Sequence, residues 1–197
     1  MTVSCSRALP ALLRLRTHVL AAGAAALLLA LPLQAQKATE HDVKAAYLFN
    51  FGKFLRQPEV GDKPPATTFD ICVMGHDDVS GVLERLTANE HVNGLPERTL
   101  KVTTAAAARK CSILFVSSSE SERLEQVLAD VSGYPVLTVS DMPQFLSRGG
   151  MIEFKTQDNH VRFSVGLGAV NKAGLSLSSE LLRVALEVTG APKRGAQ

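Results

Sequence analysis

The sequence predicts an α/β fold, a single three-layer sandwich in which a mostly parallel, Rossmann-like sheet is flanked by helices and ends in a C-terminal antiparallel hairpin. Through most of the chain, short apolar runs rich in β-branched residues alternate with segments of helical periodicity, which is typical of a parallel sheet. Towards the C-terminus, two such runs follow each other with only a short polar tract between them, which is typical of a hairpin.

The sandwich is expected to begin with a helix over residues 41–56. Tyr47, Phe51 and Phe54 recur there at helical spacing. Together with Phe49, they place four of the ten aromatic residues within eight positions. We expect this stripe to cover the sheet. The alternative is that part of the surface, above all Phe49, contacts a partner or a second copy, because aromatic residues are enriched at the cores of interfaces.

The remaining elements are separated by Gly, Pro, Asp and Ser residues, which favour turns and helix caps. The expected parallel strands cover residues 69–74, 99–103, 112–117 and 135–140. The helices or helical turns between and after them cover residues 78–88, 105–110, 120–131 and 142–147. The hairpin strands are expected at 151–155 and 160–165, followed by helices over 167–173 and 177–188.

The first 35 residues have the features of a cleaved export signal. Three arginines precede an uncharged 15-residue run, Val19 to Leu33, and Ala35 offers a small residue at the cleavage position. A retained membrane anchor is the alternative, but this run is shorter than the roughly 20 residues that span a bilayer. We therefore expect a periplasmic protein, cleaved after Ala35, with one domain over residues 36–197 and no membrane insertion of its own.

Loss of the signal also changes the charge of the chain. Removing its three arginines from the 21 basic residues leaves 18 basic against 19 acidic residues, a net charge of −1. The apparent basicity of the full chain therefore comes from the signal. Nucleic-acid binding loses its support, because it requires a basic surface.

Two cysteines, Cys72 and Cys111, remain in the mature chain. An even pair in an oxidising compartment favours a disulfide over two free thiols. A doubly wound strand order of 2-1-3-4 would make the first and third strands neighbours and bring the two cysteines together. Cys72 lies late in its strand whereas Cys111 precedes its own, so the parallel register would have to be offset.

Polar residues follow the carboxyl ends of three expected strands, the edge at which open α/β sheets bind ligands. They are His76 and Asp77, then Ser117, Ser118 and Ser119, then Asp141. These residues are candidates for binding a small anionic or polar ligand, and the alternative is that the Asp and Ser side chains cap helices. The other histidines show no metal-ligand spacing, so we predict no metal, no cofactor and no catalytic residue.

The chain also resembles the YfiR family of periplasmic proteins in segments that run, in order, through nearly all of the mature sequence. These segments are Val43 to Phe54, Phe69-x-Ile71-Cys72-Val73-x-Gly75, Cys111-x-Ile113-Leu114-Phe115-Val116-Ser117, Val136 to Asp141, Gly149-Gly150-Met151-Ile152-x-Phe154, Val161-Arg162-Phe163 and Leu175-x-Leu177-Ser178-Ser179-x-Leu181-Leu182. Each segment is a weak signal alone, but the ordered set is fairly specific.

The resemblance implies a non-catalytic regulator that binds the periplasmic part of an inner-membrane diguanylate cyclase and represses it, which controls cyclic-di-GMP and biofilm formation. It further implies an α/β fold, a homodimer and a family disulfide at the places of Cys72 and Cys111. Two features depart from the family pattern. The chain lacks the cysteines of a second disulfide found in some relatives, and Gly166 replaces the usual Asn after the last hairpin strand.

Because the hairpin breaks the alternation of strands and helices, we expect it to be an edge element that contacts the partner. Ile152, Phe154, Arg162 and Ser164 are the candidate contacts. Replacing Ile152 or Phe154 with Lys is then expected to release the partner without unfolding the protein. The alternative function is a periplasmic sensor module that binds a small ligand and acts on another membrane receptor or a histidine kinase.

Overall fold

The computed structural model describes residues 38–58 and 66–190, so the predicted export signal lies outside the described residues. The helices are α2 (Glu40–Phe54), α3 (Val79–Thr87), α4 (Ala105–Ala108), the 3-10 helix η1 (Ser118–Arg123), α5 (Leu124–Val131), α6 (Leu167–Lys172) and α7 (Ser179–Val184). The strands are β1 (Leu55–Arg56), β2 (Phe69–Met74), β3 (His91–Val92), β4 (Leu95–Val102), β5 (Ile113–Val116), β6 (Leu137–Ser140), β7 (Ile152–Gln157), β8 (His160–Gly166), β9 (Ser176–Leu177) and β10 (Glu187–Thr189).

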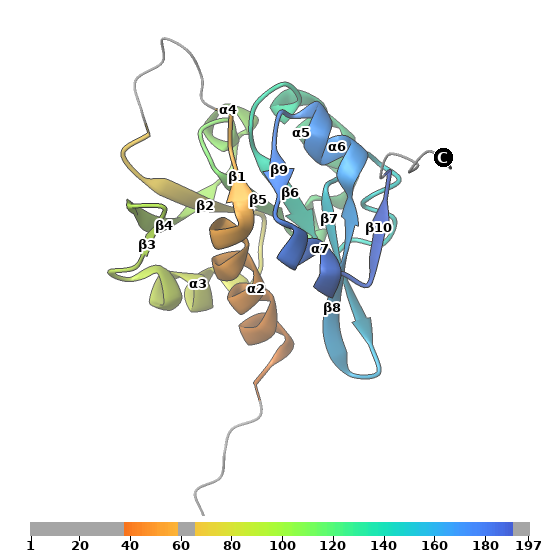
Figure 1. Ribbon diagram of the computed structural model, residues 1–197, viewed down its shortest axis with the longest axis horizontal. Helices are drawn as coiled ribbons and strands as arrows, with labels where there is room; N and C mark the ends of the chain where they lie inside the picture. The colour runs from red at the N-terminus through yellow and green to blue at the C-terminus, as the bar shows by residue number, and fades with distance from the viewer. Residues whose placement is uncertain (1–37, 59–65, 191–197) are drawn as a thin grey trace, which may run out of the picture. The chain divides into compact units, whose positions relative to one another are not determined.

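Eight strands form one sheet in the order β10-β8-β7-β6-β5-β2-β4-β3, with β3 and β10 at opposite edges (Figure 1). The centre of the sheet is parallel, because β2 pairs in parallel with β4 and β5, β5 with β6, and β6 with β7. The antiparallel pairs are β7 with β8 and β3 with β4. The four predicted parallel strands therefore lie in the predicted order 2-1-3-4.

The central strands are buried on both faces of the sheet. In β2, Ile71 and Val73 face a core that includes residues of α2, α3 and α7. Cys72 and Met74 face a second core, formed with α4 and α5. This alternation follows from the two-residue period of a strand. One sheet between two helical layers is the three-layer sandwich that the sequence predicts.

The second predicted strand is longer than expected and belongs to a hairpin. β4 begins at Leu95 rather than at residue 99 and pairs with β3. Asn93 and Gly94 join the two strands with φ values of 52° and 80°, as a tight two-residue hairpin turn requires. The Asn-Gly pair is a strong hairpin signal, so β3 could have been predicted from the sequence.

The helix predicted over residues 177–188 is wrong in its second half. α7 ends at Val184, and β10 follows and pairs in parallel with the last three residues of β8. Of the apolar residues Val184, Leu186 and Val188, only Val188 lies in β10, because Val184 ends α7 and Leu186 lies between the two elements. The predicted hairpin of β7 and β8 is present, but β10 replaces it at the edge of the sheet.

The predicted disulfide joins Cys72 to Cys111, with their Cα atoms 6.0 Å apart, which is within the usual range. No offset between the parallel strands is needed, because Cys111 reaches Cys72 from the turn after α4 and not from β5. Cys111 follows α4, which packs over the face of the sheet on which Cys72 lies. Both cysteines are buried in the core on that face.

Glu97 is an unusual charged residue of the sheet, because its side chain is buried in β4. Its Oε1 atom has no hydrogen-bond partner among the described residues. Burial, reinforced by the charge of Glu90 and opposed by that of Lys53, raises the pKa of Glu97 to about 7. The folded protein therefore holds a proton on Glu97 at pH values at which the unfolded chain has already released it.

We predict that this proton makes the protein more stable in mild acid. The contribution of Glu97 is complete below about pH 4.5 and is lost as the pH rises through 7. Since one pKa unit corresponds to about 1.4 kcal/mol, stability is expected to fall by about 2 to 3 kcal/mol between pH 5 and pH 8. Urea denaturation at both pH values measures this difference. Glu97→Gln is expected to remove it, and an unchanged difference in that variant would contradict the prediction.

Candidate functional site

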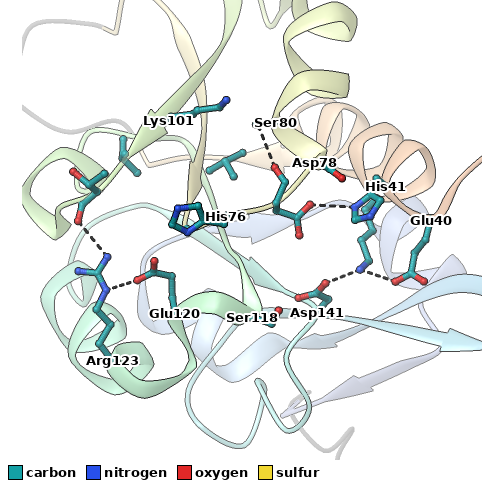
Figure 2. A pocket seen from close by; sticks show the side chains of 16 residues that line it. Glu40, His41, His76, Asp78, Ser80, Lys101, Ser118, Glu120, Arg123 and Asp141 are labelled. Atoms are coloured by element: carbon teal, nitrogen blue, oxygen red, sulfur yellow. Dashed lines mark hydrogen bonds and ion pairs between the residues drawn. The ribbon is translucent and has the colours of Figure 1, made fainter.

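A cleft of about 900 Å³ opens beyond the carboxyl ends of the parallel strands. Its walls come from the first turns of α2, the loop between β2 and α3, the end of β4 and the start of η1 (Figure 2). Four of the six predicted ligand-binding residues line this cleft, namely His76, Asp77, Ser118 and Asp141. The structure thus brings together side chains that are as many as 65 positions apart in the sequence.

The other two predicted residues, Ser117 and Ser119, hold the loop that carries His76. The Ser117 hydroxyl donates to the His76 carbonyl oxygen at 2.8 Å, and the His76 N–H donates to the Ser119 hydroxyl at 2.9 Å. Ser117 also caps η1. Gly75 precedes this loop with a φ of +92°, and a Cβ atom there would lie 2.5 Å from the Ser119 hydroxyl. The two serines therefore position the cleft residue His76.

Lys44 is a cleft residue that the sequence reasoning missed. It projects from α2, and its ammonium group lies 2.6 Å from Oδ2 of Asp141 and 2.7 Å from Oε1 of Glu40 (Figure 2). Burial by itself would lower the pKa of Lys44, but the hydrogen bonds and charges of the two carboxylates outweigh it, so the pKa is raised. The same contact lowers the pKa of Glu40. The spacing of Glu40 and Lys44 on one helical face was the available signal.

A second contact links α2 to the floor of the cleft. The ring nitrogen Nδ1 of His41 lies 3.2 Å from Oδ1 of Asp77, which also accepts a hydrogen bond from the Val79 N–H at 2.8 Å. Five of the residues that line the cleft are carboxylates, against two lysines, one arginine and two histidines. This balance favours a polar or zwitterionic ligand over a simple anion.

The described residues of the cleft form no metal site. Within residues 38–58 and 66–190, no three His, Cys, Asp or Glu side chains lie close enough together to hold a metal ion. Three of the five cleft carboxylates pair with lysine or arginine side chains, since Lys44 contacts both Glu40 and Asp141. Lys44 pairs with Asp141, and Arg123 pairs with Glu120 on the opposite wall (Figure 2).

Three of the four predicted partner contacts on the hairpin lie inside the protein. Ile152, Phe154 and Ser164 are 0%, 3% and 0% exposed, so they cannot contact a partner on the surface of this structure. They are buried because the hairpin is an interior part of the sheet, covered by helices and by β10. Arg162 is exposed and is the one member of the set that keeps its place as a candidate contact.

The aromatic residues of α2 pack against the hairpin. The rings of Tyr47 and Phe51 lie 5.3 Å and 5.2 Å from the ring of Phe163, and both also lie within 6.0 Å of the ring of Phe154. The expectation that this helix covers the sheet is confirmed. Phe49 is half-buried, with the ammonium group of Lys53 at 4.5 Å from its ring centre. Phe49 therefore leaves only part of its ring exposed for contact with a partner.

Comparison with known proteins identifies the family of the chain. A family model described as YfiR/HmsC-like matches residues 41–186, which include the hairpin and all of α2 and of the cleft residues except Glu40. The chain belongs to the YfiR/HmsC-like family. The resemblance seen in the ordered sequence segments is thereby confirmed, and the match ends at residue 186, directly before β10.

Comparison with solved structures supports the fold of this YfiR/HmsC-like chain. A crystal structure of a conserved domain protein from Vibrio cholerae O1 biovar El Tor has a TM-score of 0.52 to it at 8% sequence identity. The similarity covers 77% of this chain and 61% of the Vibrio chain, so this protein spans less than two thirds of that length. No curated protein sequence matches the chain. None of the described helices has the length and apolar character that crossing a bilayer requires.

Proposed function

We propose that this protein is a periplasmic, non-catalytic regulator that represses an inner-membrane diguanylate cyclase by direct contact, and so limits cyclic-di-GMP and biofilm formation. The observation that carries this proposal is the YfiR/HmsC-like match over residues 41–186. The proposal includes export by the signal in residues 1–35, a mature domain over residues 36–197 and assembly as a homodimer. A soluble partner represses an enzyme only through a higher affinity for the inactive state of that enzyme.

The basic end of the hairpin supports a contact surface for the cyclase. Figure 1 shows the tip of the β7–β8 hairpin projecting past the rest of the sheet, and β10 pairs with β8 only from Ser164 onward within the described strands. Arg162 faces Lys155 directly across the two strands, and the Lys155 ammonium group lies 3.7 Å from Oε1 of Glu153. Glu153 offsets one of the two opposed positive charges, and an acidic surface on a partner would offset the other. Arg162 is therefore the contact residue in this proposal.

We predict that Arg162→Glu abolishes repression without destabilising the protein. The reason is that a carboxylate would repel the acidic surface of the cyclase while pairing with Lys155. The measurement is the cyclic-di-GMP content of a deletion strain complemented with each variant. Deletion is expected to raise the cyclic-di-GMP content, and complementation with the wild type is expected to lower it again. The matched charge reversal Lys110→Glu is expected to lower it equally, since Lys110 is exposed in the turn after α4 and not on the hairpin.

Two outcomes would contradict the proposal at different levels. If deletion leaves cyclic-di-GMP unchanged, the protein does not repress a diguanylate cyclase. If deletion raises the cyclic-di-GMP content but Arg162→Glu lowers it as well as the wild type does, repression stands and the hairpin contact is wrong. Sedimentation velocity on the purified domain tests the homodimer separately.

The cleft supports a second candidate function, a sensor module that binds a small ligand and acts on a membrane receptor or a histidine kinase. Besides its size, the favourable observation is Asp141, whose Oδ1 atom is buried without a hydrogen-bond partner among the described residues. A ligand with a hydrogen-bond donor, such as an amine, would satisfy this oxygen.

A thermal-shift screen with amino acids, polyamines, nucleotides and phosphate tests the sensor function. We predict that an amine-bearing compound raises the melting temperature, because a ligand that binds only the folded state stabilises it. His76→Ala is expected to reduce this shift, whereas His160→Ala, an exposed histidine at the tip of the hairpin, is expected to leave it unchanged. No shift with any compound, or an equal loss in both variants, would contradict binding in the cleft.

A further inference from the structure

A second, smaller pocket is lined by residues of α5 and α6, which Figure 1 shows near each other. It encloses about 180 Å³ and is distinct from the cleft, with which it shares no lining residue. Leu128 and Val131 of α5 form one wall, and Ala169 and Ala173 of α6 form the other. Engineered cavities of about 150 Å³ bind molecules of the size of benzene, so this space is large enough for a small ligand.

A buried hydroxyl in this apolar pocket has nothing to bind. Thr138, in the middle of β6, lines the pocket and is 1% exposed, and its Oγ1 atom has no hydrogen-bond partner among the described residues. The neighbouring side chains of β6 do not share this defect, since the Ser140 hydroxyl donates to the Val116 carbonyl at 2.7 Å. Buried polar groups are hydrogen-bonded in native proteins with few exceptions, so an unpaired hydroxyl points to a missing group.

The charge of the pocket is set by one residue. Lys172 of α6 lines it and is exposed to solvent, whereas none of the described residues that line the pocket is acidic. A ligand therefore meets a cation at the solvent side, apolar walls between the helices and a hydroxyl on the strand below. A carboxylate is the group that this cation would attract, and an apolar body suits the two helical walls.

We propose that this pocket binds a small hydroxy-monocarboxylic acid with an apolar body. Its carboxylate pairs with Lys172, and its hydroxyl, at the other end of the apolar body, hydrogen-bonds to the Thr138 hydroxyl. The geometry requires all three parts, because the cation and the hydroxyl lie on different elements and the space between them is apolar. The pocket lies next to the hairpin through Met151, which directly precedes β7, but it does not include the proposed contact residue Arg162.

The experiment compares three probes of similar size by calorimetric titration of the purified domain. The probes are 4-hydroxybenzoate, benzoate, which lacks the hydroxyl, and phenol, which lacks the carboxylate. The wild type is expected to prefer 4-hydroxybenzoate over benzoate by about 10-fold, the value of one net hydrogen bond. It is expected to prefer 4-hydroxybenzoate over phenol by a few-fold, and this margin should shrink with added salt, because Lys172 is exposed.

Single variants assign each preference to its residue. Thr138→Val keeps the shape of the side chain and is expected to remove the preference over benzoate while raising the melting temperature, because an unpaired buried hydroxyl is lost. Thr138→Ser keeps the hydroxyl and is expected to keep the preference. Lys172→Gln is expected to remove the preference over phenol and to leave the preference over benzoate unchanged.

The opposite results overturn the proposal. If the wild type binds none of the three probes at millimolar concentration, the Thr138 hydroxyl is satisfied by water only and the pocket is not a ligand site. If Thr138→Val is folded and still prefers 4-hydroxybenzoate over benzoate, the hydroxyl does not contact the ligand. If Lys172→Gln retains the preference over phenol, the assignment of the carboxylate to this cation is wrong.

Discussion

Phe154→Lys is expected to unfold the protein, or to leave it close to unfolding, rather than to release a partner from an intact surface. Phe154 is 3% exposed and packs against the rings of Tyr47, Phe51 and Phe115. Truncating a buried aromatic residue costs about 3 to 5 kcal/mol, and burying an ammonium group without a partner adds to that cost. Since a typical domain has only about 5 to 15 kcal/mol of stability, this change removes most of it.

Circular dichroism and urea denaturation measure this loss, with Arg162→Glu as the matched control in the neighbouring strand. The control is expected to change the free energy of unfolding by less than about 0.5 kcal/mol, because Arg162 is exposed. A folded Phe154→Lys variant with near-normal stability would show that the side chain can reach solvent. It would then restore the hairpin interior as a contact surface.

Loss of the disulfide between Cys72 and Cys111 is the second large effect that we expect. The bond closes a loop of 39 residues. In the chain-entropy model, it lowers the entropy of the unfolded chain and so raises the free energy of unfolding by roughly 3 to 4 kcal/mol. Cys72→Ala with Cys111→Ala is therefore expected to lower the free energy of unfolding by about this amount. Alanine is the right replacement because both sites are buried and apolar.

Denaturation with and without a reductant provides the internal control. The wild type is expected to lose stability on reduction, and the double variant is expected to be insensitive to the reductant. If reduction leaves the wild-type transition unchanged, the disulfide contributes little to folding. If reduction lowers repression at temperatures where the protein stays folded, the bond also acts in signalling.

The parallel half of the fold could be predicted because its local signals agree with one another. Residues 69–74, predicted as the first strand, are those of β2, and the strand order followed from a rule about doubly wound sheets. The C-terminal part could not be predicted so well. Leu181 and Leu182 fit a helix and lie in α7, whereas Val188 lies in β10, and no sequence pattern marks where the helix ends at Val184.

The cleft was found in part because strand ends are informative and helix faces are less so. His76, Asp77, Ser118 and Asp141 follow strands, and the topology alone places them together. Lys44 lies in a helix 97 positions before Asp141, and no local pattern connects the two. The hairpin contacts failed for a related reason. The hairpin was expected at the edge of the sheet because it breaks the alternation of strands and helices, but β10 follows it in the sheet and α2 packs on Phe154.

Helix α2 belongs both to the cleft and to the support of the hairpin. Its first turns carry Glu40, His41 and Lys44 at the cleft, and its next turns place Tyr47 and Phe51 against the hairpin rings. If a ligand binds in the cleft and shifts this helix, and if a partner binds the hairpin, the ligand changes the affinity for that partner. By thermodynamic reciprocity, the partner must change the affinity for that ligand by the same factor. The membrane protein would then set the concentration at which its own regulator responds.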